Sequence, residues 1–229
     1  MISIIIPAYN EEKVIEKCIT SLGREIRRIT RDYEIIIVEE SNDRTPEIVE
    51  KLAKKSKKII HIHSNVRLGK GGAIERGVQA SKGSKIIFMD ADLSTDLSYL
   101  NVLISKLDEY DLVIGSRYHP SSKIKRTFLR LVLSKIYSAL FRIAFGLNFR
   151  DIQCGFKGFT KKLAAEIIPQ IHSKDFFWDT ELVYLAKKNG FRIREIEIEW
   201  KERKGGIRTT IKMVKSMLFS STRLFFRRL

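Results

Sequence analysis

Short apolar runs alternate with amphipathic segments along the first half of the chain. The runs occupy residues 2–7, 33–39, 59–64, 85–89 and 111–115. Helical periodicity covers residues 11–28 and the stretch after residue 72 up to about residue 82, and Thr45-Pro46-Glu47 is typical of a cap followed by a first helical turn. Buried strands that alternate with helices are the pattern of a parallel sheet covered on both faces. This half is therefore predicted to be doubly wound α/β.

The second half has a different pattern. A long basic and apolar segment, residues 123–145, has helical periodicity, and a glycine-containing patch follows at 151–160. We expect a helix near residues 179–188, an alternating strand at 192–200 and a basic helix at the end of the chain. Because no internal repeat or Pro/Ser-rich linker appears, we expect residues 1–229 to form one domain with surface helices.

Composition adds a strong charge imbalance to this picture. The hydrophobic fraction of 44% and the charged fraction of 31% fit a folded globular protein. The 43 Lys and Arg residues outnumber the 27 Asp and Glu residues, and the net charge is +16. Such an excess predicts an anionic partner, which could be nucleic acid, a phosphorylated substrate or an anionic membrane surface.

The positive charge is concentrated in two segments, residues 112–150 and 203–229, neither of which contains an acidic residue. Projected as helices, residues 123–145 and the last segment are both basic on one side and apolar on the other. Each could pack its apolar side on the core, or lie in the headgroup layer of an anionic membrane. We favour the membrane surface, and we expect no nucleic-acid partner because no recognised nucleic-acid motif is present.

The chain shows neither a spanning segment nor a disulfide framework. Its best apolar stretch, residues 129–147, is interrupted by Arg130, Lys135 and Arg142. The amino terminus lacks a basic leader and fits a first strand better than a signal peptide. Cys18 and Cys154 are predicted to be free thiols, and the four histidines form no metal-ligand pattern.

Asp90-Ala91-Asp92 stands directly after the apolar run at 85–89. Two carboxylates one residue apart at the carboxyl edge of a sheet suit Mg²⁺ or Mn²⁺ that carries a substrate diphosphate. The alternative is an ordinary strand-ending turn, in which Asp is common.

Three further segments are predicted to reach the same edge. Residues 7–12 follow the first strand and residues 39–43 follow the second, where polar groups could hold a base and a ribose or simply form a helix entry and a turn. Residues 65–73 lead into a helix whose amino terminus, with Lys70, favours a phosphate. Their spacing does not fit a P-loop, so an NTPase is excluded.

Together these segments resemble the inverting glycosyltransferases of family two, and most closely the branch that transfers glucose to dolichyl phosphate, with the mannose-transferring branch a near relative. The resemblance covers most of the chain. The motifs are Ile4-Ile5-Ile6-Pro7-Ala8-Tyr9-Asn10-Glu11-Glu12, Gly69-Lys70-Gly71-Gly72-Ala73-Ile74, Asp90-Ala91-Asp92, Ile114-Gly115-Ser116-Arg117, Asp151-Ile152-Gln153-Cys154-Gly155-Phe156-Lys157 and Phe177-Trp178-Asp179-Thr180-Glu181-Leu182. It implies a nucleotide-diphospho-sugar transferase fold of the GT-A type, a divalent metal (Mg²⁺ or Mn²⁺) and a polyprenyl or dolichyl phosphate acceptor.

The resemblance also implies roles for individual residues. Residues 1–117 would be the nucleotide-sugar-binding half, and residues 118–229 the acceptor and membrane-facing half. Asp90 and Asp92 would hold the metal, and Asp92 and Asp179 would be the catalytic residues. Asp179 and Glu181 could position the acceptor or the sugar hydroxyls, or simply stabilise the dipole of the helix that they begin. Apart from the resemblance, Arg117, Arg126 and Arg130 are suited to hold the acceptor phosphate, because a guanidinium group binds phosphate through two N–H groups. The donor nucleotide sugar would contact Pro7, Tyr9, Glu11, Glu39, Lys70, Asp90, Ala91 and Asp92.

The expected protein is therefore a peripheral hexosyltransferase on the cytoplasmic face of the cell membrane, or of the endoplasmic reticulum membrane in a eukaryote. The family usually has Asp-Asp-Gly-Ser after the second strand, whereas this chain has Glu39-Glu40-Ser41. The donor thus stays open between UDP-glucose, which we favour, and GDP-mannose. Other readings are a transferase with a soluble or protein acceptor, and a basic adaptor that binds anionic lipid or RNA.

Overall fold

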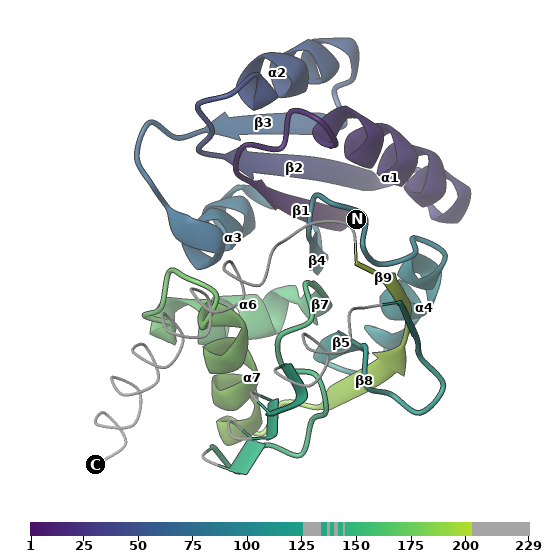
Figure 1. Ribbon diagram of the computed structural model, residues 1–229, viewed down its shortest axis with the longest axis vertical. Helices are drawn as coiled ribbons and strands as arrows, with labels where there is room; N and C mark the ends of the chain where they lie inside the picture. The colour runs from purple at the N-terminus through teal and green to yellow at the C-terminus, as the bar shows by residue number, and fades with distance from the viewer. Residues whose placement is uncertain (126–133, 137, 140–141, 144, 203–229) are drawn as a thin grey trace.

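The computed structural model describes residues 1–125, 134–136, 138–139, 142–143 and 145–202 (Figure 1). Its main sheet has seven strands in the order β3-β2-β1-β4-β7-β5-β8, and a second sheet pairs β6 with β9. The strands are β1 Ile2–Ala8, β2 Tyr33–Glu39, β3 Ile59–His63, β4 Lys85–Met89, β5 Leu112–Ser116, β6 Lys123–Lys125, β7 Phe156–Thr160, β8 Ile193–Glu197 and β9 Glu199–Lys201.

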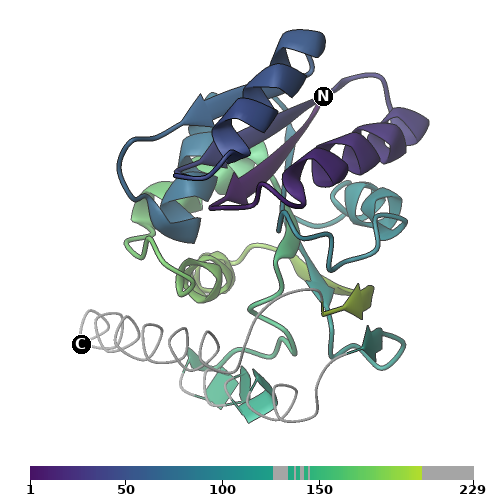
Figure 2. The ribbon, with the colours of Figure 1, turned by 45° about the horizontal axis from the view of Figure 1, so that its top comes forward.

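Helices cover both faces of the main sheet. They are α1 Ile15–Ile29, α2 Thr45–Lys55, α3 Gly69–Ala80, α4 Tyr99–Lys106, α6 Lys161–Ile167 and α7 Trp178–Lys188, and a 3-10 turn, η1 Ile168–Gln170, follows α6. The helices α1 and α2 pack together at one end of the sheet (Figure 2). The predicted doubly wound, mostly parallel α/β fold is confirmed.

Side-chain alternation along the strands shows which helix lies on which face. Gly23 of α1 faces Ile35, and Leu103 of α4 approaches Gly158, on the face that also carries Ile4. Gly77 of α3 packs against Ile5 on the opposite face, where the α7 residue Trp178 meets Phe88. Gly77 has no room for a side chain, because a Cβ atom there would lie 2.5 Å from Ile5 Cγ2. Since both faces are buried, the strands read as continuous apolar runs rather than alternating ones.

The strand β7 was not predicted. It runs antiparallel between β4 and β5, so that Phe88 pairs with Lys157 and Ile114 also pairs with Lys157. The sequence indicated only a glycine-containing patch there, because Lys157 and Gly158 interrupt any apolar run. The observed sheet is therefore mixed, with one strand from the second half inserted into its centre.

Several boundaries also differ from the predictions. The helix α1 begins at Ile15, because the N–H groups of Glu11 and Glu12 donate to Thr45 Oγ1 and Asp43 Oδ2 in the loop before α2. Thr45 is therefore the first residue of α2, and the cap position belongs to Arg44. The strand expected at 192–200 is split, and its second part pairs with residues 123–125.

That pairing corrects one expectation about the basic segment. Residues 123–125 form β6 instead of the start of a helix, since they pair with Glu199–Lys201. The described residues from 134 to 145 are helical, whereas Arg126, Arg130 and the expected final basic helix lie outside the described residues. Within the described part of the chain, no helix has the length and apolarity needed to cross a membrane.

Both cysteines are buried free thiols, as predicted. Cys18 lies in α1, and Cys154 lies just before β7. Burial raises the pKa of each thiol to about 12, and nearby carboxylates, chiefly Asp92 for Cys18 and Asp151 for Cys154, add to the shift.

We expect the Phe159→Ala variant to lose about 3 to 5 kcal/mol of unfolding free energy, because it removes a fully buried ring from the inserted strand. The Phe159 ring centre lies 6.4 Å from that of Phe88. Urea unfolding measures the change. Phe176→Ala is the matched control, since Phe176 is 37% exposed and its loss should cost less than about 1 kcal/mol. Equal losses in the two variants would contradict the central place of β7.

Candidate functional site

Three neighbouring parallel strands end at the same edge of the sheet. Ala8 of β1 pairs with Glu39 of β2, and Ile5 pairs with Phe88 of β4. Tyr9, Glu40 and Asp90, the residues that follow these strands, are therefore brought to one edge, where ligands bind in open α/β sheets. The α3 amino terminus and the first turn of α7 reach the same region through Lys70 and Asp179.

Asp90 lies close to the β7 backbone and remains open to solvent. Its N–H donates to Gly155 O at 3.0 Å, and its side chain is 46% exposed. The carboxylate occupies the space that a Cβ atom of residue 155 would fill, so a side chain there would displace it. Desolvation raises the pKa of Asp90, the charges of Asp92 and Asp179 add to this, and Lys70 opposes it.

Asp92 forms the turn that follows β4. Its Oδ1 accepts the Ser94 N–H at 2.9 Å, and its Oδ2 accepts the Ser94 hydroxyl at 2.7 Å. Between them Leu93 has φ 55°, a left-handed conformation that is strained for leucine. The turn interpretation of the Asp-Ala-Asp motif thus holds for Asp92. A cation could bind only the lone pairs of the Asp92 carboxylate that Ser94 does not use. Ala91 is buried between the two carboxylates.

Lys70 bridges two carboxylates. Its Nζ lies 3.1 Å from Asp90 Oδ1 and 3.3 Å from Asp179 Oδ2. Burial alone would lower the pKa of Lys70, but the charges of Asp179 and Asp90 outweigh it and raise the pKa above its usual range. Lys70 is therefore a fixed ammonium group at the amino terminus of α3.

Asp179 is held from its other side by Lys157 of β7. Both side chains are buried, and the Lys157 ammonium contacts Asp179 Oδ1 and donates to Cys154 O at 2.6 Å. Asp179 stands in the first turn of α7, where a carboxylate also stabilises the helix dipole. Lys157 was missed as a site residue, because its burial depends on the unpredicted strand β7.

Glu39 turns into its own loop instead of toward the open edge. It is fully buried, accepts the Ser41 N–H at 2.9 Å, and its Oε1 lies 3.0 Å from His61 Nε2 and 2.6 Å from His63 Nδ1. Burial would raise the pKa of Glu39, but these hydrogen bonds outweigh it and lower the pKa. The bond to Glu39 in turn raises the pKa of His63. A direct contact of Glu39 with a nucleotide stays a prediction.

Glu40, which belongs to the segment 39–43 predicted to hold a base and a ribose but was given no role of its own, organises the loop that precedes α3. Its carboxylate accepts the N–H groups of Leu68 and Gly69, and lies 3.2 Å from Arg67 Nη1. The Arg67 guanidinium stacks 3.4 Å from the ring centre of Tyr9, a side chain that is 44% exposed. Glu40 therefore fixes an arginine over an exposed aromatic face.

The other two predicted donor residues, Pro7 and Glu11, lie in β1 and in the loop that follows it. Pro7 is within β1 and is half-buried. The Glu11 N–H donates to Thr45 Oγ1 at 2.9 Å, which ties the loop after β1 to the start of α2.

Arg117 is committed to Asp151. The fork of its guanidinium donates through Nε at 2.7 Å and Nη2 at 2.8 Å, and its backbone N–H donates at 2.9 Å to the same carboxylate. Burial would raise the pKa of Asp151, but Arg117 outweighs it and holds that pKa below its usual range. The pair is a structural anchor. Phosphate binding by Arg117 stays a prediction, and it would use the guanidinium N–H groups that do not donate to Asp151.

A metal ion at this edge would need further donor atoms from the substrate that binds with it. In the described ranges, no group of three or more His, Cys, Asp and Glu side chains could hold a metal ion. Asp90 and Asp92 supply hard oxygens, which suit Mg²⁺ or Mn²⁺ bound jointly by one or two carboxylates and substrate phosphates. The donor set therefore fits a metal that enters with a diphosphate.

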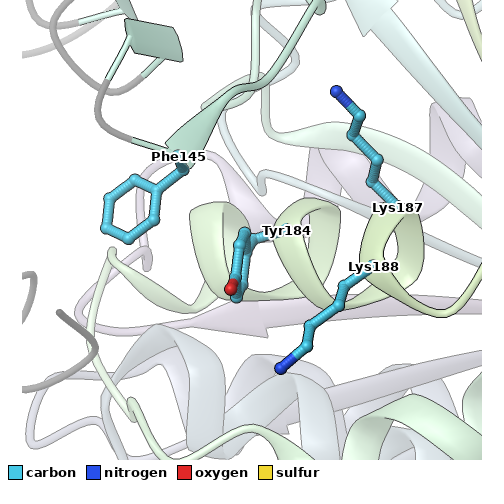
Figure 3. A pocket seen from close by; sticks show the side chains of 4 residues that line it. All are labelled: Phe145, Tyr184, Lys187 and Lys188. Atoms are coloured by element: carbon cyan, nitrogen blue, oxygen red, sulfur yellow. The ribbon is translucent and has the colours of Figure 1, made fainter. Parts of the chain in front are cut away.

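A hollow lies at the opposite end of α7 from Asp179. Its volume is about 330 Å³, and it is lined by Phe145, Tyr184, Lys187 and Lys188 (Figure 3). The aromatic rings of Phe145 and Tyr184 meet edge to face with their centres 5.4 Å apart. Lysines in the last turn also complement the helix dipole, which accounts for their place without a ligand.

We expect Arg117→Met to lower the unfolding free energy by about 3 to 5 kcal/mol, because it leaves the buried Asp151 carboxylate without its partner. Chemical denaturation at pH 7 measures the loss. Arg194→Met is the matched control, since the Arg194 side chain is exposed and only stacks on Tyr110 at 5.9 Å. A stability equal to that of the control would show that Arg117 is not the anchor.

Comparison with known proteins places the chain in a family. A sequence model described as glycosyl transferase family 2 matches residues 3–168. Glycosyltransferase AglD of Haloferax volcanii is 35% identical over 95% of this chain, which spans 35% of that protein. The dolichyl-phosphate beta-glucosyltransferase of Dictyostelium discoideum is 32% identical over 95% of this chain and 72% of its own length, and the human protein of that name is 30% identical over 95% and 74%.

Solved structures share the fold. Glucosyl-3-phosphoglycerate synthase from Mycobacterium tuberculosis, in complex with Mn²⁺, UDP and phosphoglyceric acid, superimposes with a TM-score of 0.73 over 95% of this chain and 76% of that chain. Its identity of 18% limits this likeness to the fold. The family match over most of the chain and the relatives above 30% identity carry the assignment. The chain belongs to glycosyl transferase family 2 and is a glycosyltransferase.

Proposed function

We propose that this glycosyltransferase moves a hexose, with glucose favoured, from a nucleotide-diphosphate sugar to polyprenyl or dolichyl phosphate with inversion at the anomeric carbon. The observation that carries the proposal is the cluster of Asp90, Asp92 and Lys70 at the carboxyl edge of the sheet. It combines hard oxygens with a fixed ammonium group, which is the combination that a diphosphate and its metal need. The names of the curated relatives support the glucose donor and the dolichyl phosphate acceptor.

The nucleotide would lie along the loops after β1 and β2. The Arg67 guanidinium, held by Glu40, covers one face of the Tyr9 ring, so a base would stack on the outer side of this Arg67–Tyr9 pair. The N–H groups at the start of α3 and Lys70 favour the diphosphate. UDP in the related folds supports a uridine donor, and GDP-mannose is the second candidate because the loop at Glu39-Glu40-Ser41 departs from the family pattern.

Asp90 and Asp92 would hold Mg²⁺ or Mn²⁺, whose chemistry is to neutralise charge on the leaving nucleotide diphosphate. Lys70 would add a positive charge beside the same group. A lipid phosphate is already anionic near neutral pH, since the second pKa of a phosphate monoester is about 6. The acceptor therefore needs little help from a base. Asp179, buried between two ammonium groups, would position Lys70 and the reacting groups rather than remove a proton.

The acceptor would meet the acid-free segment 112–150, which contains Arg126 and Arg130. Arg117, in the same segment, directly follows β5. Cations that gather next to an anionic bilayer are each worth about 1 kcal/mol of attraction. We therefore place the enzyme at a membrane surface, on its cytoplasmic side.

A soluble acceptor is the second candidate function. The similar fold of glucosyl-3-phosphoglycerate synthase was solved with phosphoglyceric acid, so this architecture accommodates a small anionic acceptor in that protein.

We expect Asp92→Asn to reduce sugar transfer at least about 100-fold, because it removes one of two carboxylates that would bind the metal. Transfer of labelled glucose from UDP-glucose measures the effect. Asp96→Asn is the matched control, since Asp96 lies in the same loop and its side chain accepts the Ser98 N–H, which an Asn oxygen can also accept. Full activity of the Asp92 variant would overturn the proposed metal site.

With labelled UDP-glucose and polyprenyl phosphate in anionic vesicles, we expect the label to enter the solvent-extractable lipid. GDP-mannose in the same assay tests the alternative donor, and phosphoglyceric acid tests the soluble acceptor. Product that stays entirely in the water phase would refute the lipid acceptor.

A further inference from the structure

Lys70 joins two carboxylates that differ in their freedom to change partners. Asp179 is 1% exposed and is fixed by the buried Lys157 ammonium, whereas the Asp90 side chain is 46% exposed. An incoming cation can therefore reach Asp90 from solvent, but it cannot reach Asp179 without dismantling the interior.

Asp179 has spare capacity to keep Lys70 in place. Its Oδ2 is buried and makes no hydrogen bond within the part of the chain that the structure describes, although Lys70 Nζ lies 3.3 Å away. If the Lys70 ammonium left Asp90, Asp179 Oδ2 could accept a hydrogen bond from it. Lys70 would then stay beside the edge of the sheet, within reach of a bound phosphate.

The charges make a bare metal ion a poor ligand here. A divalent cation that binds Asp90 Oδ1 must displace the Lys70 ammonium, and one that binds Asp90 Oδ2 lies next to that ammonium and is repelled by it. A metal that arrives with a diphosphate brings negative oxygens that Lys70 can contact instead. The lost ion pair is then replaced, so the complex binds more readily than the ion alone.

We propose that Lys70 is an internal counter-cation of the metal site. Its ammonium group pairs with the Asp90 carboxylate until the donor diphosphate brings the metal in. This inference rests on the proposed function, because it requires Asp90 and Asp92 to receive that metal. Lys70 is a positioning residue in this sense, and it makes metal affinity depend on the donor.

The test is the binding of Mn²⁺ to the full chain, measured by the electron paramagnetic resonance signal of free Mn²⁺ at pH 8 with and without UDP. The wild type should bind Mn²⁺ alone weakly and at least about tenfold more tightly with UDP. Lys70→Met should bind Mn²⁺ alone about tenfold more tightly than the wild type, because the competing ion pair is gone. The gain from UDP should shrink accordingly.

Lys174→Met is the matched control. Lys174 also lies beside the start of α3 but its ammonium pairs with Glu75, so this variant removes the same charge without touching Asp90 or Asp179. Its Mn²⁺ affinity should equal that of the wild type. Lys70→Gln, which removes the charge but retains a hydrogen-bond donor, replaces Lys70→Met if thermal unfolding shows that the latter is not folded.

The outcomes separate the two proposals. If the wild type binds Mn²⁺ with UDP but Lys70→Met binds Mn²⁺ alone no more tightly than the wild type, the counter-cation role is wrong and the metal site stands. Equal gains in Lys70→Met and Lys174→Met would also overturn it, since the effect would be one of net charge. Failure of the wild type to bind Mn²⁺ even with UDP would overturn the metal site itself.

Discussion

The buried ion pair between Lys157 and Asp179 is the interaction on which the site depends. Two charges removed from water cost several kcal/mol each, and only close pairing and further hydrogen bonds offset that cost. Here Cys154 O accepts a hydrogen bond from Lys157, and Lys70 approaches the second oxygen of Asp179. Four side chains of alternating charge, Lys157, Asp179, Lys70 and Asp90, thus lead from the interior to the edge of the sheet. Each forms an ion pair with its neighbour.

These ion pairs explain why a strand from the second half is inserted between β4 and β5. The strand β7 carries Lys157 into the centre of the sheet, while Gly155, just before it, lets Asp90 lie against its backbone. The two halves of the chain therefore meet at the candidate site, both through the pairing of β7 with β4 and β5 and through ion pairs. Carboxylates also hold the loops after β2 in place. Glu39 is hydrogen-bonded to His61 and His63, and Glu40 accepts an N–H group at the start of α3.

The parallel strands could be predicted from the sequence because each is an apolar run with polar ends, and β2 and β4 match their predicted limits. The strand β7 could not, since its second residue is a lysine whose buried charge is paired with a carboxylate 22 residues away. The Asp90 and Asp92 pair was recognisable from its place after a strand. Glu40 and Lys157 were not, because their roles arise from contacts with Arg67 and Asp179 that no local pattern encodes.

The burial of Cys18 and Cys154 has a practical consequence. Thiols with a pKa of about 12 contain almost no thiolate near neutral pH, and thiolate is the form that alkylating reagents attack. A cysteine introduced at the protein surface would then be labelled selectively without prior removal of the native ones. Val66, which is 67% exposed beside Arg67, is a suitable position for a fluorophore or nitroxide that reports on the loop above Tyr9.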